Sequence, residues 1–252
     1  MKKAKTHIIA PYLANPNHII TIALIGTGGT GSHMLSNLAM INQALIHTGR
    51  VSFHVTAYDP DIVSESNIGR QLFSPADIHR NKAIVLVERI NRFYGFAWDA
   101  MPEKYNGEEQ SSNIIISCVD TLKAREDVFK KIKKRSFHGD NYSDHKNTWY
   151  WMDIGNERNH GQVILGTVFK GRIGRKTFSL PHFFDEFQDV QEENIGDACS
   201  AHAMYNKQNL FINKFMATLA SNMIWTLFKD YQISYRGIYF NLDRFSMTQI
   251  SI

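Results

Sequence analysis

The sequence predicts one α/β domain with a Rossmann-like, mostly parallel sheet, helices on both faces of the sheet, and antiparallel strands added at the C-terminal end. First, residues 19–25 form an apolar run without polar alternation, which is typical of a strand covered on both faces. Second, this run leads directly into the glycine cluster GTGGTG at residues 26–31, after which the spacing becomes helical. Third, strand-like and helix-like segments alternate up to residue 155, and strand alternation closes the chain over residues 234–250.

The remaining elements follow from the same patterns. Further strands are predicted at residues 51–58, 113–120, 148–155 and 161–171, and helices at residues 32–47, 82–94, 121–135 and 201–229. The polar connection from residue 59 to 81 is long but keeps apolar anchors, which indicates an ordered, functional loop. We therefore interpret residues 1–252 as a single domain, in which residues 18–158 form a nucleotide-binding core. Residues 159–252 then supply a crossover, the long helix and the closing strands.

Composition excludes several classes of protein. The chain is 43% hydrophobic and 21% charged, which is ordinary for a globular protein, and its formal charge of +4 is too small to indicate nucleic-acid binding. Two cysteines without a Cys-x-x-Cys pair can build neither a disulfide framework nor a cysteine-rich zinc site. The N-terminus lacks the apolar region of a signal peptide, and no apolar run is long enough to span a bilayer. We expect a soluble, cytoplasmic protein that binds neither nucleic acid nor a membrane.

The glycine cluster is the first candidate site. Gly26-x-Gly28-x-x-Gly31 lies between a predicted strand and a predicted helix, where small residues let the backbone approach phosphate oxygens. The start of the helix adds exposed N–H groups and partial positive charge, which favour an anion. Asp59 follows the second strand and could accept both ribose hydroxyls. NAD-binding and some ATP-binding folds share this pair of features, and a glycine turn needed only for tight packing is the simpler alternative.

The stretch SNIGRQLF at residues 66–73 separates these possibilities. Asn67 and Arg70 lie on the long connection, and Lys82 follows it. Together they could supply the fixed positive charge that a triphosphate demands, whereas a dinucleotide fold does not need them. The alternative is that Arg70 and Lys82 are solvated surface charges.

Several motifs, taken together, resemble those of a known family. GTGGTG, YDPDIVSESNIGRQLF, the pair Asn81 and Lys82, and IISCVD ending at Asp120 are similar in kind and order to the ThiF/MoeB/HesA branch of the ubiquitin-activating-enzyme superfamily. The resemblance covers roughly residues 18–170. The later segment from Cys199 to Trp225 is similar to the ThiF-related member of the bacterial PRTRC cassette.

The resemblance implies a reaction and a set of site residues. ATP, with Mg²⁺, would activate the C-terminal carboxylate of a small ubiquitin-like protein with a glycine-ending tail, giving an acyl-adenylate and pyrophosphate, and the enzyme would be a homodimer. Thioester formation or sulfur transfer could follow the activation. Arg70 and Lys82 would be catalytic through positioning and charge neutralisation. The nucleotide would be held by Gly26, Gly28, Gly29, Gly31, Asp59, Asn67, Arg70, Gln71, Lys82 and Asp120. Asp120 matches the family's magnesium-associated aspartate, and its alternative role as a helix N-cap is compatible with that one.

The sequence also departs from the family's pattern. Many relatives carry a zinc site made by two Cys-x-x-Cys pairs, which this chain cannot form, so no zinc is predicted. Residues 1–17 offer only lysines where relatives commonly place an arginine that reaches the partner subunit's ATP. Cys199, just before the long predicted helix, is a candidate acceptor of the activated acyl group, and a small buried apolar residue is the alternative. Two rival functions stay open: an inactive nucleotide-binding adaptor for a partner protein, and an NAD-dependent oxidoreductase.

Overall fold

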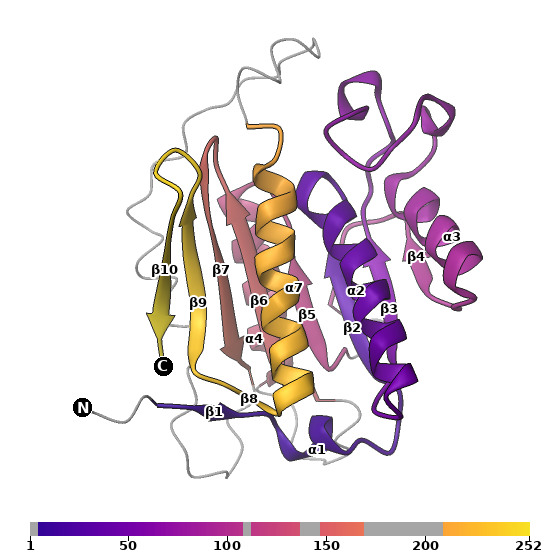
Figure 1. Cartoon of the computed structure of the whole chain (residues 1–252). Coiled ribbons are helices and arrows are strands. Elements are labelled where there is room, and N and C mark those ends of the chain that lie inside the picture. Colours follow the sequence, from indigo (N-terminus) through magenta and orange to yellow (C-terminus); the bar gives the residue numbers. More distant parts are fainter. Residues whose placement is uncertain (1–4, 108–111, 137–146, 169–208) are drawn as a thin grey trace.

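An eight-stranded sheet dominates the computed structural model, which describes residues 5–107, 112–136, 147–168 and 209–252 (Figure 1). Its strands follow the order β10-β9-β7-β6-β5-β2-β3-β4. Strands β4, β3, β2, β5 and β6 run parallel, and β7, β9 and β10 extend the sheet in antiparallel fashion, which confirms the predicted fold class. The bounds are β2 Ile20–Ile25, β3 Phe53–Tyr58, β4 Asp99–Met101, β5 Ile114–Ser117, β6 Tyr150–Asn156, β7 His160–Thr167, β9 Tyr235–Asn241 and β10 Ser246–Ser251.

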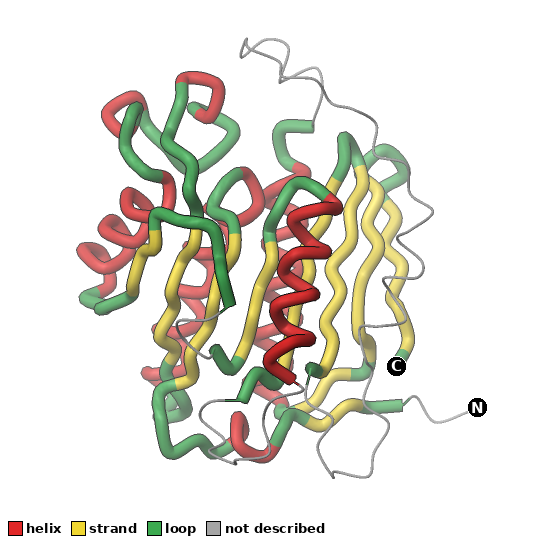
Figure 2. The backbone as a smooth tube through the Cα atoms, turned by 180° about the vertical axis from the view of Figure 1, so that it is seen from behind, coloured by secondary structure: helices red, strands yellow, loops and turns green. Residues whose placement is uncertain are grey.

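Helices cover both faces of this sheet. One face carries α2 (Gly29–His47), α3 (Lys82–Tyr94) and α7 (Ile212–Asp230), and Figure 2 shows α4 (Leu122–Ser136) crossing the opposite face. Successive side chains of a strand point to opposite faces, so Leu24 joins the core cluster beneath α2 and α7 while its neighbour Ile25 joins the cluster beneath α4. Both faces of β2 are therefore buried, which explains its unbroken apolar run.

Some elements differ from the sequence prediction. Strand β4 was not predicted, because its three residues carry no apolar run. The long helix was predicted from residue 201, but residues 209–211 lie outside α7, since the Asn209 side chain accepts a hydrogen bond from the Phe211 N–H at 2.9 Å and turns the chain there. Residues 201–208 are outside the described ranges. Short elements that the sequence patterns did not predict are β1 (His7–Ile8), α1 (Pro11–Ala14), the 3₁₀ helices η1 (Glu65–Asn67) and η2 (Pro75–Asp77), and β8 (Gln232–Ile233). No helix in the described part of the chain is long and apolar enough to cross a membrane.

The sheet order creates a switch point at β2. Strand β2 pairs with β3 on one side and with β5 on the other, so the chain proceeds from β2 to β3 and β4 in one direction and then returns to β5 on the other side of β2. Ligands of open α/β sheets bind beyond the carboxyl ends of the strands at such a point. Gly26 follows β2 there and Cys118 follows β5, so the predicted glycine turn lies at the position where this architecture binds ligands.

Candidate functional site

Two glycines are required by the shape of the turn itself. Gly26 has φ of +85° and donates its N–H to the Tyr58 carbonyl at 2.8 Å, and a Cβ added to it would lie 2.9 Å from the Cys118 carbonyl oxygen. A Cβ on Gly31 would lie 1.9 Å from the carbonyl oxygen of Gly26. The tight turn between β2 and α2 therefore accounts for both residues without a ligand.

The two central glycines differ from each other. A Cβ on Gly29 would lie 2.7 Å from the side chain of Asn213 in α7, so a packing contact explains this glycine. Gly28, the residue before α2, has φ of −73°, and a Cβ there would meet only the Gln71 amide, at 3.9 Å. No left-handed φ and no close contact among the described residues accounts for glycine at position 28. The turn is thus open to a ligand at Gly28, next to the N-terminus of a long helix.

Asp59 braces the glycine turn from the end of β3. Its buried carboxylate accepts hydrogen bonds from the N–H and the hydroxyl of Thr27, at 2.6 and 2.9 Å, and from the Asp61 N–H at 2.9 Å. A carboxylate has about four acceptor positions, so these three donors leave room for about one more. Holding both ribose hydroxyls, as predicted from the sequence, would displace one of the present donors.

Lys82 lies in the same hydrogen-bonded cluster. The side chain of Asn81 caps α3 by accepting from the Ile84 N–H at 3.1 Å, and its amide donates to the Asp59 carbonyl at 2.8 Å. Lys82 is the first residue of α3, and its ammonium donates to the Asp61 carboxylate at 3.0 Å. The Lys82 side chain is 9% exposed and that of Asp61 is 64% exposed. A buried cation is therefore paired with a carboxylate whose own side chain lies largely in solvent.

The connection between β3 and α3 brings Gln71 to the turn. Gln71 is buried, its amide lies opposite Gly28, and its Oε1 has no hydrogen-bond partner among the described residues. The Leu72 N–H also lies 3.4 Å from the Ser32 hydroxyl of α2, which ties this loop to the helix. An unsatisfied buried carbonyl oxygen beside an open glycine indicates a missing hydrogen-bond donor at that position.

Asn67 and Arg70 occupy the same loop with different surroundings. The buried Asn67 side chain accepts from the N–H of Ser64 at 3.0 Å and from its hydroxyl at 3.2 Å, so it shapes the loop through a capping box. Arg70 is half-buried and directly precedes Gln71. Contact of Asn67 and Arg70 with phosphates stays a prediction from the family resemblance.

Asp120 follows β5 at the carboxyl edge and is exposed. The hydrogen bond that caps α4 runs from the Ala124 N–H to the Thr121 hydroxyl at 3.2 Å, so Thr121 serves as the cap and the alternative capping role of Asp120 is wrong. No group of three or more His, Cys, Asp or Glu side chains that could hold a metal occurs in the described ranges. Mg²⁺ bound with a nucleotide uses one or two carboxylates together with phosphate oxygens, and a single exposed Asp120 fits that donor set.

The sequence patterns missed two buried polar groups at this edge. Arg125 of α4 and Asp153 of β6 form an ion pair, with 3.5 Å between Nε and Oδ2. The hydroxyl of Thr30, in the first turn of α2, lies 3.0 Å from the side-chain oxygens of both Asn156 and Asn213 and shares its one hydrogen between them. Asp153 could have been found from the sequence, because a carboxylate inside the apolar run TWYWMDIG indicates a buried charge that needs a partner. The Thr30 contacts could not, because they join segments far apart in the chain.

Of the two cysteines, only Cys118 lies in the described part of the chain. Burial, with the negative charge of Asp153, raises the pKa of the Cys118 thiol well above its ordinary range, although Arg125 opposes the shift. Cys118 directly follows β5 and packs, partly buried, against the main apolar core. Cys199 lies outside the described residues, as does the connection that contains it.

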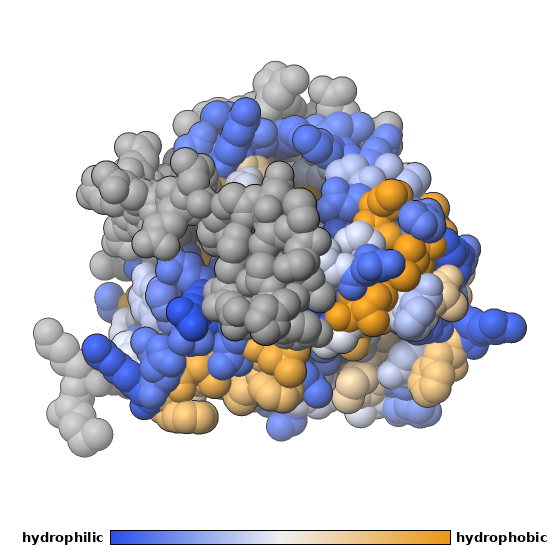
Figure 3. All heavy atoms as spheres, turned by 90° about the horizontal axis from the view of Figure 1, so that it is seen from above, coloured by the Kyte–Doolittle hydropathy of each residue, from blue (hydrophilic) through white to orange (hydrophobic). Residues whose placement is uncertain are grey.

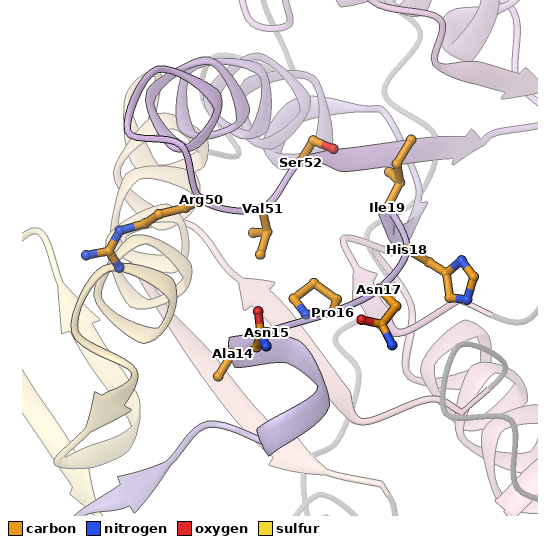
Figure 4. A pocket seen from close by; sticks show the side chains of 9 residues that line it. All are labelled: Ala14, Asn15, Pro16, Asn17, His18, Ile19, Arg50, Val51 and Ser52. Atoms are coloured by element: carbon orange, nitrogen blue, oxygen red, sulfur yellow. The ribbon is translucent and has the colours of Figure 1, made fainter.

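The two ends of the sheet present different surfaces. Figure 3 looks onto the carboxyl ends of the parallel strands and shows apolar side chains gathered on one side among polar ones. A cavity of about 320 Å³ lies at the opposite end of the sheet, lined by residues 14–19 and 50–52 before β2 and β3 (Figure 4). There Arg50 donates to the Phe228 and Lys229 carbonyls, at 2.9 and 2.6 Å, so its cation caps the end of α7.

Comparison with known sequences gives one family for nearly the whole chain. The model of the ThiF family matches residues 18–250. Ubiquitin-like modifier-activating enzyme 6 of Mus musculus is 32% identical over 117 residues, which cover 42% of this chain and 11% of that enzyme. Ubiquitin-activating enzyme E1 1 of Candida albicans (strain WO-1) is 29% identical over 119 residues, with the same two coverages of 42% and 11%. The chain therefore spans about a tenth of the length of these relatives.

Comparison with solved structures gives the same architecture. The crystal structure of PaaA superposes with a TM-score of 0.61 at 16% identity, and the alignment covers 92% of this chain and 64% of PaaA. The structure of Escherichia coli MccB with ATP gives a TM-score of 0.59 at 14% identity and covers 95% of this chain and 64% of MccB. At these identities the likeness shows the fold, and the chain spans just under two thirds of either protein.

Proposed function

Since the chain belongs to the ThiF family, we propose that it binds ATP at the glycine turn and adenylates the C-terminal carboxylate of a small protein. The observation that carries this proposal is the open backbone at Gly28, which faces the Gln71 amide, whose Oε1 lacks a hydrogen-bond donor among the described residues. Lys82 supports it as a buried cation, joined to the turn through Asp61, Asp59 and Thr27. Phosphate oxygens would accept from Lys82 and from the exposed N–H groups at the start of α2, and a ribose hydroxyl would donate to Oε1 of Gln71.

The similar proteins support ATP rather than NAD as the ligand of this chain. Two relatives are activating enzymes for ubiquitin or a ubiquitin-like modifier, and MccB was solved with ATP and with MccA. For this chain we propose a small ubiquitin-like protein with a glycine-ending tail as the partner, and a cytoplasmic homodimer as the active form. The polar loop that carries Asn67, Arg70 and Gln71 has a shared purpose in ATP binding, which the oxidoreductase alternative does not give it.

The proposed reaction joins two anions. A carboxylate oxygen of the partner attacks the α-phosphorus of ATP, and the bond from that phosphorus to the pyrophosphate oxygen breaks, which gives acyl-adenylate and pyrophosphate. No side chain has to remove a proton, because the carboxylate is already ionised at pH 7. Arg70 and Lys82 act by positioning the phosphates and neutralising their charge. Mg²⁺, held by Asp120 and phosphate oxygens, would neutralise charge on the departing pyrophosphate.

ATP–pyrophosphate exchange tests this function. Small proteins encoded beside this chain, with flexible tails ending in glycine, are the substrates to try. Exchange should fall by about 10²–10³-fold in Arg70→Ala or Lys82→Ala. Arg80→Ala and Lys130→Ala are matched controls, because both cations are exposed and pair with glutamates of helices α3 and α4, and exchange in these variants should stay near that of the parent.

Two outcomes would favour the rival functions. Mg-ATP should raise the melting temperature by mass action more than NAD does, and a larger shift with NAD would favour the oxidoreductase. ATP binding without exchange for any candidate partner would favour the adaptor.

A later transfer step involves Cys199. In this step the Cys199 thiolate attacks the acyl carbon, and AMP leaves as the carbon–oxygen bond to it breaks. A thiol-labile adduct with the partner should form in the parent protein and be absent in Cys199→Ser. Persistence of the adduct in that variant would show that Cys199 is not the acceptor.

A further inference from the structure

Arg125 and Asp153 form a buried pair of charges next to the proposed nucleotide site. Their side chains are 13% and 6% exposed. Oδ1 of Asp153 accepts from the Ser117 hydroxyl at 2.6 Å, and that hydroxyl accepts from the Trp151 indole N–H at 2.7 Å. The carboxylate is therefore fixed by β5 on one side and by the guanidinium of α4 on the other.

The Arg125 guanidinium also donates to backbone carbonyls of two neighbouring segments, the loop after β5 and strand β6. One of its terminal nitrogens donates to the Val119 carbonyl at 3.1 Å and to the Ile154 carbonyl at 3.4 Å. The space for it depends on Gly155, because a Cβ there would lie 2.7 Å from the same nitrogen. The Val119 carbonyl belongs to the peptide group that precedes Asp120, so Arg125 fixes the backbone from which the Asp120 side chain projects.

The glycine turn holds the same loop from the other direction. The Cys118 carbonyl lies against Gly26, and the Cys118 side chain lies against Gly31. Residues 118–120 are thus held between the nucleotide turn and the Arg125–Asp153 pair. A buried ion pair is weak evidence for stability, since desolvation offsets much of its attraction, and its best-supported value is a defined geometry.

We propose that Arg125 and Asp153 are positioning residues that set Asp120 in place for the metal ion that accompanies ATP. This inference rests on the proposed function, and it assigns to the buried pair a part in metal-dependent nucleotide binding. Replacing a residue that orients a metal ligand commonly lowers metal affinity by about 10–100-fold.

Titration calorimetry with ATP, at several Mg²⁺ concentrations, tests the inference on the full chain. Arg125→Lys keeps the charge but loses the forked contact with the two carbonyls, and Asp153→Asn keeps the shape but loses the charge. Mg²⁺ should increase ATP affinity, and in both variants the Mg²⁺ concentration at the midpoint of this increase should rise about 10-fold. ATP affinity without Mg²⁺ should stay close to that of the parent. Amide hydrogen exchange of residues 119–121 in the ligand-free protein should become faster.

A double-mutant cycle distinguishes positioning from a structural role. In an Asp120→Asn background, Arg125→Lys should cause no further change in the Mg²⁺ dependence, because the residue through which it acts is gone. Equal losses of ATP affinity with and without Mg²⁺, parallel to a loss of stability in urea, would overturn the inference. If the parent protein binds Mg-ATP and both variants titrate like it, this inference fails and the proposed function stands. If the parent does not bind Mg-ATP, both fail.

Discussion

The Asp59 carboxylate accepts both the N–H and the hydroxyl of Thr27, at 2.6 and 2.9 Å, and so locks the end of β3 onto the glycine turn that follows β2. This contact joins the two features that mark a nucleotide site in the sequence. The residue expected to hold the ribose is thus also the residue that holds the turn in shape.

Asp59→Asn should weaken both the fold and the site. The amide group would place a donor against the Thr27 or Asp61 N–H, which leaves buried groups unsatisfied, and we expect a loss of about 1–3 kcal/mol in the free energy of unfolding. Urea denaturation measures the loss, and calorimetry should show weaker ATP binding. Thr27→Val removes only one of these bonds and should cost less. A variant as stable as the parent would show that the Thr27–Asp59 contact does not shape the turn.

Gly28→Ala and Gly31→Ala should have opposite effects. At Gly28 an added methyl group meets only Gln71, at 3.9 Å, so the protein should fold with a free energy of unfolding within about 1 kcal/mol of the parent. The methyl group would occupy the space that a phosphate needs, and ATP affinity should drop about tenfold or more. At Gly31 the methyl group would lie 1.9 Å from the Gly26 carbonyl, so this variant should fail to fold stably. Unchanged ATP affinity in Gly28→Ala would place the ligand elsewhere.

Asp61→Asn should retain or strengthen ATP binding. The Asp61 carboxylate pairs with Lys82 at 3.0 Å and competes with any anion for that ammonium. Removing its charge frees Lys82 for phosphate, although the free energy of unfolding should decrease because a buried cation loses its counter-charge. Lys82→Met serves as the contrasting variant and should lose ATP affinity. Equal losses of ATP affinity in Asp61→Asn and Lys82→Met would mean that Lys82 acts only as a partner of Asp61.

Mild acid should lower the free energy of unfolding through His7. His7 Nε2 lies 2.7 Å from the Tyr150 hydroxyl, and burial lowers the pKa of His7 from 6.5 to about 4. Between these values the folded protein binds fewer protons than the unfolded chain, so the free energy of unfolding should fall as the pH drops from 6.5 towards 4. Urea unfolding at about pH 7 and about pH 5 measures this loss, which should be smaller in His7→Gln.

A matched control for His7 is available in the same chain. His160 is an exposed histidine paired with Glu157 at 3.0 Å, and His160→Gln controls for the loss of one histidine from the surface. If His7→Gln and the parent lose the same free energy of unfolding between the two pH values, His7 does not cause the acid sensitivity.

Local sequence patterns predicted the parts of the site that depend on neighbouring residues. An unbroken apolar run, a glycine cluster and helical spacing placed the β2–α2 turn correctly, because strand and helix periodicities are properties of short segments. Helical spacing predicted a helix over residues 82–94, and the structure has α3 at Lys82–Tyr94, with Asn81 as its cap. Asp59 was expected at the end of the second strand, and it lies directly after β3.

Only the tertiary structure decided which of these residues meet and what each glycine is for. The pairs Arg125–Asp153, Gly29–Asn213 and Gln71–Gly28 join segments whose order along the sheet is set by long-range strand pairing. No local pattern encodes such pairing, since it depends on how whole elements bury their apolar faces against one another. The sequence by itself therefore determined the fold class and the candidate groups. Packing accounts for glycine at positions 26, 29 and 31, and it leaves Gly28 with open space, which is where we propose that ATP binds.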